Sequence, residues 1–243
     1  MQQKTSGIIL NQVKYKDTSS IVSVYTRQFG RISYAVRHTN SKKSVVKSAL
    51  IQPLTLVEME VAHNPKKEIQ EIKEIRISIP FHEIPFNPAK NAIALFISEV
   101  LQKMLKHSIS DETLYDFIES SVCELDNCQS GVANFHLVFL AGFAKQLGFA
   151  PDIFNPNDFD FPYFDMIDGI FLNHQPSHAY FLKNEKARMF NEIMQENYQT
   201  LDQIAFTRNQ RNEMLDCLLD YFKIHFAEFQ TIRSVEILHQ LWE

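Results

Sequence analysis

Residues 20–37 read SIVSVYTRQFGRISYAVR, and this stretch predicts a β-hairpin. Its first part, residues 20–26, is rich in β-branched and aromatic residues, which are enriched in strands. The dipeptide Phe29-Gly30 predicts the turn, because glycine readily adopts positive φ. Between Arg31 and Arg37 apolar and polar residues alternate, so one face should meet a core and the other, with both arginines, should face solvent. The residues expected to face inward are Ile32, Tyr34 and Val36.

The segment from residue 27 to residue 47 carries positive charge and no carboxylate. Residues 38–47 form a polar, basic loop that is long for a small β domain, and they are therefore a candidate binding loop. A cationic strand face beside a basic loop is the electrostatic pattern expected for binding a phosphate backbone. The alternative is a solvated basic surface without a partner. The cations of the segment are Arg27, Arg31, Arg37, Lys42, Lys43 and Lys47.

Three further segments before residue 80 predict strands. Residues 7–13 are an apolar run, and residues 55–62 alternate between apolar side chains and glutamates. Residues 68–78 have a partly helical spacing, which we interpret as a strand with a β-bulge. Residues 14–19 are expected to form a polar loop. Five short strands of this kind predict a small closed barrel, for which the OB fold is the leading candidate.

Three prolines between Pro80 and Pro88 mark a boundary, since proline interrupts both helices and sheets. Apolar residues then recur at helical spacing, except in residues 149–182, where four prolines and many aromatic residues predict short hairpins or a packed irregular insert, with a turn at Asp168-Gly169. Asp111 is the expected N-cap of the second helix. The expected helices are residues 89–106, 112–125, 132–147, 184–199, 206–226 and 234–242.

The predicted fold class is therefore α+β. A five-stranded OB-fold barrel that binds nucleic acid is expected at residues 1–79, followed by a linker at residues 80–88. An α-helical bundle domain, with its insert at residues 149–182, is expected at residues 89–243.

Charge divides the chain in two. Residues 1–79 hold 13 Lys and Arg against 6 Asp and Glu, a balance of +7, whereas residues 80–243 hold 11 against 23, a balance of −12. Such asymmetry predicts different partners for the two halves. The N-terminal segment lacks the apolar run of a signal peptide, and no run approaches the ~18 residues of a membrane span. We therefore expect a cytoplasmic protein that does not bind membranes.

The sequence indicates no catalytic or metal site. The three cysteines, Cys123, Cys128 and Cys217, are expected to be free thiols, because their spacing does not provide a tetrahedral metal site. Phosphate-binding, nucleophile-elbow and zinc-protease motifs are all missing from the sequence. We therefore expect a protein that is not an enzyme and that needs no cofactor.

Several motifs follow one another in a characteristic order. KYKDTS, residues 14–19, comes after the first apolar strand, and LIQPLTLVEMEV, residues 50–61, comes after the hairpin. FHLVFLAGFAKQLGFAP, residues 135–151, is an apolar helix with a Gly-Phe-x-Pro exit. In YFKIHFAEFQTIRSVEIL, residues 221–238, an aromatic-x-x-His motif precedes Arg233-Ser234. Together these motifs cover nearly the whole chain, and they resemble the bacterial recombination mediator RecO family.

This resemblance implies a non-enzymatic DNA-repair protein of the RecF pathway, associated with the nucleoid. It implies binding of single- and double-stranded DNA, annealing of complementary strands, and loading of the recombinase RecA onto strands coated by single-strand-binding protein. The implied partners are RecR and the acidic, hydrophobic C-terminal tail of single-strand-binding protein, with RecF as a further candidate. Lys103, Lys106, Lys145 and Arg188 are candidates to meet that tail, and the alternative is that the helical half is only a scaffold.

One feature departs from the family pattern. Many members carry two Cys-x-x-Cys pairs for zinc after the central helix, whereas residues 149–182 of this chain contain no cysteine. The aspartates of the insert, together with His174 and His178, do not have the spacing of a tetrahedral site. We therefore expect a zinc-free insert that is held together by packing of phenylalanine and tyrosine side chains.

The DNA-binding site is expected on the basic face of the barrel. Tyr15 and Phe29, both expected in loops, are candidates for base stacking, which contributes roughly 1–3 kcal/mol per base. Tyr25 and Tyr34 could instead be buried. No element that reads base edges is evident, so binding should be independent of sequence. The alternative function is a protein-interaction adaptor whose barrel binds an acidic protein. The residues expected to contact phosphates are Lys14, Lys16, Arg27, Arg31, Arg37, Lys42, Lys43 and Lys47.

Overall fold

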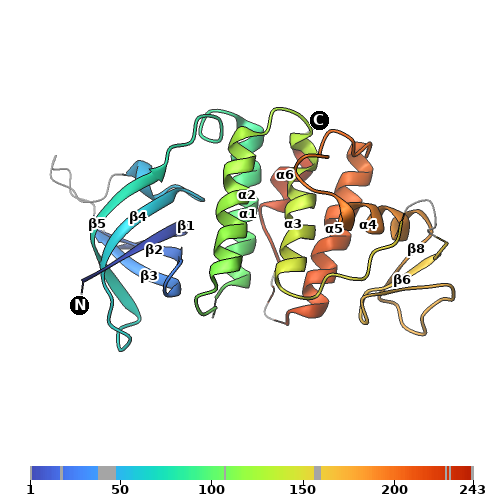
Figure 1. Cartoon of the computed structure of the whole chain (residues 1–243), viewed down its shortest axis with the longest axis horizontal. Helices are drawn as coiled ribbons and strands as arrows, with labels where there is room; N and C mark the ends of the chain where they lie inside the picture. The colour runs from blue at the N-terminus through green and yellow to red at the C-terminus, as the bar shows by residue number, and fades with distance from the viewer. Residues whose placement is uncertain are drawn as a thin grey trace. The chain divides into compact units, whose positions relative to one another are not determined.

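The computed structural model describes residues 2–16, 19–37, 48–106, 108–155, 160–227, 229 and 231–241 (Figure 1). The chain forms two compact units. The first unit contains Met1–Asn127 and Ile232–Leu238, and the second contains Cys128–Thr231 and His239–Glu243. The linker predicted at residues 80–88 lies inside the first unit, which holds the barrel and the two helices that follow it.

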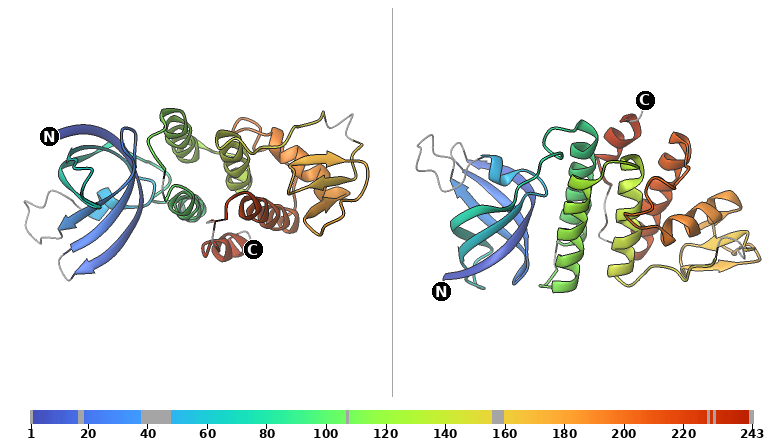
Figure 2. Two further views of the ribbon diagram at one scale, coloured as in Figure 1. Left: turned by 90° about the horizontal axis from the view of Figure 1, so that it is seen from below. Right: turned by 45° about the horizontal axis from the view of Figure 1, so that its top comes forward.

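The first unit begins with a closed five-stranded barrel, which confirms the predicted fold class (Figure 2). Its strands are joined in the order β1-β2-β3-β5-β4, the order of an OB fold. All neighbouring pairs are antiparallel except β3 and β5. The bounds are β1 Gln2–Lys16, β2 Ser19–Thr26, β3 Gly30–Arg37, β4 Leu56–Ala62 and β5 Ile69–Ile79, and a 3-10 turn, η1, spans Ser48–Ile51.

The interior of the barrel follows the predicted alternation. Tyr34 and Val36 of β3 are buried in the core, and Ile32 packs against it, while Gly30 adopts the positive φ of 67° that the turn requires. The bulge predicted in β5 is confirmed, because the register with β4 shifts between Glu74 and Ile72.

The first strand is longer than the sequence suggests. β1 begins at Gln2 and ends at Lys16, so the prediction of a loop at residues 14–19 is wrong for its first residues. Polar residues 2–6 pair through their backbones with β4. This pairing has no hydrophobic signature, and therefore periodicity alone could not reveal it.

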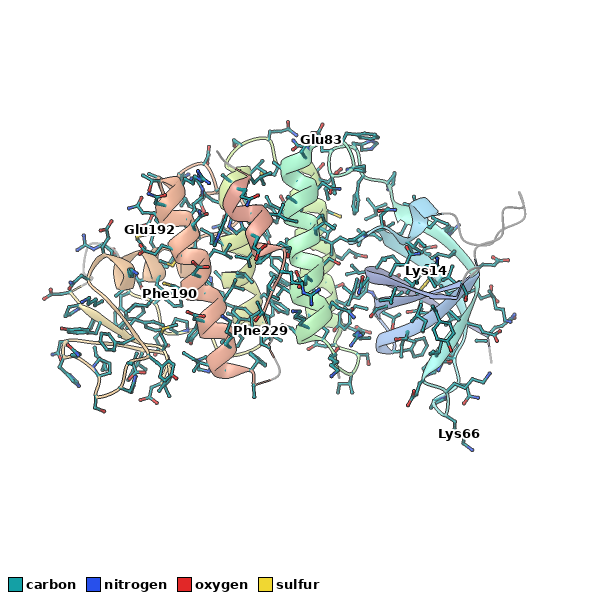
Figure 3. The ribbon with its side chains drawn as sticks, turned by 180° about the vertical axis from the view of Figure 1, so that it is seen from behind. Lys14, Lys66, Glu83, Phe190, Glu192 and Phe229 are labelled. Atoms are coloured by element: carbon teal, nitrogen blue, oxygen red, sulfur yellow. The ribbon has the colours of Figure 1, made fainter. Side chains whose placement is uncertain are left out.

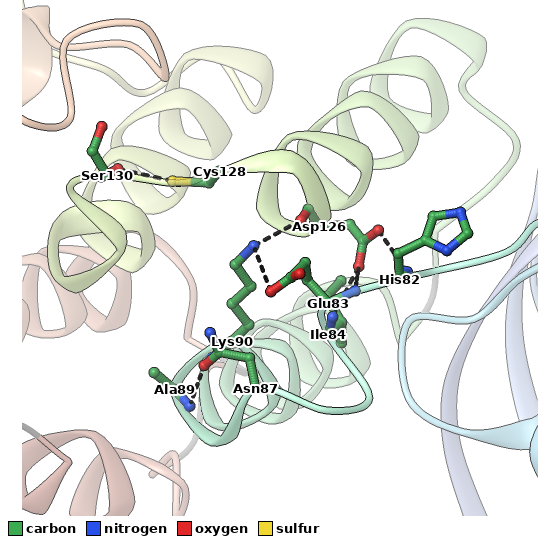
Figure 4. A network of polar contacts seen from close by, with 9 residues as sticks. All are labelled: His82, Glu83, Ile84, Asn87, Ala89, Lys90, Asp126, Cys128 and Ser130. Carbon is green, nitrogen blue, oxygen red and sulfur yellow. Dashed lines mark hydrogen bonds and ion pairs between the residues drawn. The ribbon is translucent and has the colours of Figure 1, made fainter.

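The segment that leaves the barrel is fixed by a network of polar contacts (Figure 4). The carboxylate of Asp126 accepts hydrogen bonds of 2.9, 2.9 and 2.8 Å from the backbone N–H groups of His82, Glu83 and Ile84. Lys90, only 1% exposed, donates from Nζ to the backbone oxygen of Asp126 at 2.7 Å. Burial alone would raise the pKa of Asp126, but these backbone hydrogen bonds and the Lys90 charge lower it below its ordinary value.

Two helices pack beside the barrel within the first unit. They are α1, Pro88–Met104, and α2, Glu112–Asn127. Asn87 caps α1, and the prediction that Asp111 caps α2 is confirmed by a 3.0 Å hydrogen bond from Leu114 N to Asp111 Oδ1. The carboxylate of Glu99 accepts from Arg233 N and Ser234 N, each at 2.9 Å, which holds the start of the last helix, α6, Val235–Gln240, against α1.

The second unit is built around α3, Phe135–Gln146, which a 3-10 turn, η2, Val132–Asn134, precedes. Almost every face of α3 is buried, as expected for a central helix, and it packs against α4, Glu185–Gln195, and α5, Arg208–His225. Gly148 ends the helix with a φ of 77°. None of the helices in the described part of the chain is both long and apolar enough to cross a membrane.

The insert contains a small sheet, in agreement with the alternative of short hairpins. Its order is β7-β6-β8, with β6 at Tyr163–Asp165, β7 at Ile170–Leu172 and β8 at Phe181–Lys183. Asp168-Gly169 forms the turn between the first two strands, and Gly169 has a φ of 67°. Phe164 of β6 packs at 4.5 Å between ring centres on Phe190 of α4. The described residues contain no group of three or more potential metal ligands.

Candidate nucleic-acid interface

The helices of the first unit cover part of the outer face of β1, β2 and β3. Tyr25 of β2 pairs with Ile8 of β1, and its ring stacks on Tyr115 of α2 with 6.0 Å between ring centres. Ser98 of α1 donates a hydrogen bond from Oγ to the backbone oxygen of Leu10. Ile8, Leu10 and Tyr25 are buried. This part of the face therefore belongs to the core between the barrel and the helices, and it cannot receive a ligand.

The other part of the same face is open. Val13 of β1 pairs with Ile21 of β2, which in turn pairs with Ala35 of β3, so the three side chains lie in one row on one face. Val13 is 57% exposed, Ile21 is half-buried and Ala35 is exposed. Tyr15 follows at a shift in register, a β-bulge, and is 59% exposed. The result is an open apolar strip of Val13, Ile21 and Ala35 with a tyrosine near its end.

Predicted phosphate-binding residues converge at this open end of the barrel. Ser19 pairs with Lys16 on one side and with Arg37 on the other, so the backbones of these two cations lie in one row across three strands. Lys14 is exposed on β1 (Figure 3), but it pairs with Ser20 and therefore lies on the face of β1 opposite Val13. The side chains of Lys16 and Arg37 lie outside the described part of the structure. All of Lys42, Lys43 and Lys47, in the loop that follows Arg37, also lie outside it.

Cationic residues are concentrated on one side of the barrel. Residues 2–37, which form β1, β2 and β3, contain six Lys and Arg and one acid, Asp17. Residues 48–79, which contain β4 and β5, hold four Lys and Arg and five glutamates. Since phosphates require an excess of positive charge, β1–β3 are the better site for a nucleic acid.

A groove of about 500 Å³ crosses β1, β4 and β5 near the β2–β3 turn, but its charges cancel. Two of these charges already bind each other, because Arg76 forms an ion pair with Glu58. A groove with balanced charge is a poor receptor for a phosphate backbone. The charged residues that line it are Lys4, Arg27, Arg76, Glu58, Glu60 and Glu74.

Arg31 lies on the outer face of β3 as predicted, and Arg27 follows directly after β2, but protein groups already bind both side chains. Arg27 donates to Asp116 of α2, and this hydrogen bond raises the pKa of Arg27 above its ordinary value. Arg31 is half-buried and donates from Nε to Ser23 Oγ at 2.8 Å and from Nη1 to the backbone oxygen of Lys106 at 3.2 Å. Burial lowers the pKa of Arg31. Both arginines therefore help to attach the barrel to the helices, and their contact with DNA stays a prediction.

The aromatic candidates occupy different environments. The prediction that Tyr15 lies in a loop is wrong, because it lies within β1, although it is exposed. Phe29 does lie in the β2–β3 turn, but its ring stacks on His63 at 4.2 Å and packs against the barrel core. One face of Phe29 is thus already covered. Tyr25 and Tyr34 are both buried, so neither is available for stacking on a base.

Two features of this site are not evident from the sequence. The open apolar strip through Val13, Ile21 and Ala35 depends on where the helices stop covering the barrel, which local periodicity does not encode. The engagement of Arg27 depends on Asp116, which is 89 positions away in the chain. Exposed valine in a strand was the one available signal for the first feature, and the acidic spacing of α2 was the signal for the second.

Comparison with known proteins gives matches along the whole chain. The family described as "Recombination protein O N terminal" matches residues 1–81, and "Recombination protein O C terminal" matches residues 85–231. The chain is 38% identical to a DNA repair protein RecO from Phocaeicola vulgatus and 36% identical to one from Bacteroides fragilis. It is 34% identical to a DNA repair protein RecO from Flavobacterium psychrophilum. In all three comparisons the match covers 100% of both chains.

Proposed function

The chain belongs to the RecO family of DNA repair and recombination proteins, and from this membership we propose that it binds DNA through the open end of its barrel. RecO proteins are repair mediators rather than a known family of enzymes. The proposed activity is binding of single- and double-stranded DNA without sequence preference, annealing of complementary strands, and loading of recombinase onto strands coated by single-strand-binding protein. Such a protein is expected to associate with the nucleoid.

The observation that carries this proposal is the convergence of cations beside an open apolar strip. Lys16 and Arg37 pair with the same residue, Ser19, and Lys14 is exposed on the other face of β1 at the same end of the barrel. Lys42, Lys43 and Lys47 follow Arg37 within ten residues of the sequence. Cations placed in this way can neutralise successive phosphates, which is the main source of affinity in sequence-independent binding.

Tyr15 and the apolar strip supply a surface for bases. The phenol ring of Tyr15 is exposed at the edge of the strip, and every base offers a flat face that can stack on an aromatic ring. Val13 and Ala35 leave room for bases because their side chains are small. Contacts to phosphates and base faces carry little sequence information, so the affinity should be similar for different sequences.

Annealing follows from the same chemistry. Two complementary strands repel each other through their phosphates, and a protein that neutralises phosphates lowers this repulsion. The flexible exchange of contacts that annealing needs is provided by point charges rather than by base-specific hydrogen bonds. RecR, RecF and the acidic, hydrophobic tail of single-strand-binding protein are the proposed protein partners, and the second, acidic part of the chain is available to bind some of them.

An annealing assay tests this proposal. Complementary oligonucleotides, labelled for fluorescence transfer, are mixed with the protein at low salt, with and without prior coating by single-strand-binding protein. We expect the protein to accelerate annealing in both cases and to bind each free strand. If the protein neither binds nor anneals DNA at low salt but still captures an acidic protein partner, the adaptor function is correct and the DNA-binding proposal is wrong.

A further inference from the structure

Two carboxylates of α2 hold the guanidinium of Arg27. Nη2 of Arg27 donates to Asp116 and lies 3.6 Å from Oε2 of Glu119. The guanidinium carbon also lies 4.5 Å from the centre of the Tyr115 ring. These three residues come from consecutive turns of one helix, so α2 presents Arg27 with two negative charges and an aromatic face at the same place.

The two carboxylates belong to an acidic stripe on α2. Glu112, Asp116 and Glu119 follow one another at spacings of four and three residues, which places them on one side of the helix. Carboxylate oxygens at regular intervals resemble the phosphate oxygens of a nucleic acid in charge and in hydrogen-bonding capacity. The carboxylates of α2 therefore offer Arg27 the same kind of anionic oxygen ligand that DNA phosphates would offer.

A DNA phosphate can replace Asp116 as the partner of Arg27. The side chain of Arg27 is 32% exposed and that of Asp116 is 57% exposed, so solvent and ions reach both partners. Ion pairs at such exposed positions contribute little to stability, because water and salt compete for both charges. A phosphate can accept two parallel hydrogen bonds from a guanidinium, and it can therefore replace the carboxylate without loss of contacts.

DNA bound at the cationic end of the barrel can reach Arg27. Ser19 at one end of β2 pairs with Arg37, and Thr26 at the other end precedes Arg27 directly. At the rise of a strand these ends are about 23 Å apart, a distance that roughly seven phosphates of one B-form strand span. Because α1 and α2 cover the outer face of β2 near Tyr25, a DNA strand reaches Arg27 only by passing outside these helices, where the side chain of Arg27 is 32% exposed.

We propose that Asp116 and Glu119 compete with DNA phosphates for Arg27 and so limit the affinity of the barrel for DNA. This inference rests on the proposed DNA-binding function, and it adds two residues that oppose binding. While α2 holds Arg27, this cation contributes no phosphate contact. When DNA occupies the barrel, Arg27 exchanges its carboxylate partners for a phosphate, and the cost of that exchange keeps the complex weaker than its cations alone would make it.

Three variants of the full chain test the competition. The first, Asp116→Asn with Glu119→Gln, removes both competing charges. The control, Glu68→Gln with Glu124→Gln, removes the same number of charges from exposed positions outside this acidic stripe. The third adds Arg27→Ala to the first. Binding of a single-stranded oligonucleotide is measured by fluorescence anisotropy between 50 and 200 mM salt, and thermal unfolding shows that each variant is folded.

The first variant should bind more tightly than the control at 50 mM salt. Freeing one cation should steepen its salt dependence by about 0.7 in log–log slope, so that it loses about threefold more affinity than the control across this salt range. With Arg27→Ala added, the additional loss of affinity with salt should disappear. The inference is wrong if the first variant and the control have the same slope, or if the additional loss persists without Arg27. If the unaltered protein fails to bind the oligonucleotide at all, the proposed function itself is wrong, which is a distinguishable result.

Discussion

The backbone N–H of Ile84 donates a 2.8 Å hydrogen bond to the carboxylate of Asp126, a residue 42 positions later in the chain. Two more N–H groups of the same segment share this carboxylate, and the buried Lys90 binds the backbone oxygen of Asp126. A segment that its prolines mark as a boundary is therefore attached to the end of α2. The barrel and the helices of the first unit are joined by this contact, and not only by the covalent chain.

Replacement of Asp126 by Asn should weaken this joint. An amide offers one acceptor oxygen, and its NH₂ group meets an N–H donor, so at least one of the three N–H groups loses its partner, and the charge beside Lys90 is lost as well. We expect the free energy of unfolding to fall by about 1–3 kcal/mol, the usual cost of an unsatisfied buried polar group. Urea unfolding at pH 7 measures the change. Glu124→Gln, an exposed substitution on the same helix, is the control and should leave the stability nearly unchanged.

Stability should also fall in acid because of Asp126 and Glu99. Burial opposes the charge of both carboxylates, but hydrogen bonds from backbone N–H groups lower the pKa of each below its ordinary value. A carboxylate whose pKa is lower in the folded state stabilises the fold above its unfolded pKa, about 4, and loses this contribution as the pH falls through the folded pKa. Urea unfolding between pH 7 and pH 3 should show this loss. Asp126→Asn should show a smaller loss, and identical pH profiles for the two proteins would contradict the assignment.

Removal of the Tyr34 hydroxyl should stabilise the barrel. Tyr34 is fully buried, and its hydroxyl has no hydrogen-bond partner among the described residues. Tyr34→Phe removes the desolvation cost of that hydroxyl, and we expect the free energy of unfolding to rise by about 1 kcal/mol or more. Tyr221→Phe is the matched control, because the Tyr221 hydroxyl donates a 2.7 Å hydrogen bond to Phe149 O. That substitution should lower the stability, and a loss of stability in both variants would show that the Tyr34 hydroxyl has a partner.

Gly30 should tolerate no side chain. Its φ is 67°, and a Cβ atom there would clash with the backbone oxygen of Ser108, between α1 and α2. Gly148 has a similar φ of 77°, but a Cβ atom there would meet no described atom within 4 Å. Gly148→Ala should therefore cost only the roughly 1–2 kcal/mol of the left-handed conformation, and Gly30→Ala should cost clearly more. Thermal unfolding of the two variants compares these costs, and equal losses would exclude the clash.

The barrel could be predicted because its signals are local. The alternation around Tyr34 and the turn at Gly30 fix the hairpin within 18 residues, and the structure confirms both. The polar start of β1 could not be predicted, because residues 2–6 are held by backbone pairing with a strand some fifty residues away. In the insert the sequence left short hairpins and irregular chain as alternatives, since three-residue strands have too few side chains to show a period.

The candidate site could be predicted only in part. The alternation correctly placed Arg31 on the outer face of β3, but it could not show that Arg31 donates to the carbonyl group of Lys106 or that Arg27 donates to Asp116. These contacts depend on how the helices of the first unit pack against the barrel, which is a tertiary property. Lys14 lies at the open end, where no helix covers the barrel, and its predicted role is therefore compatible with the packing.

The salt dependence of DNA binding tests the central claim most directly. The variant Lys14→Ala, Lys16→Ala, Arg37→Ala is compared with Lys66→Ala, Lys67→Ala, Lys73→Ala, which removes the same charge from the β4–β5 side, where Lys66 lies in the exposed turn (Figure 3). Affinity for a single-stranded oligonucleotide is measured by anisotropy from 50 to 200 mM salt. If the cations at the open end bind phosphates, the first variant should lose about 2 from the log–log slope, at roughly 0.7 for each contact, and the second should keep the slope of the unaltered protein. Equal slopes in the two variants would contradict the assignment of DNA to the open end of the barrel.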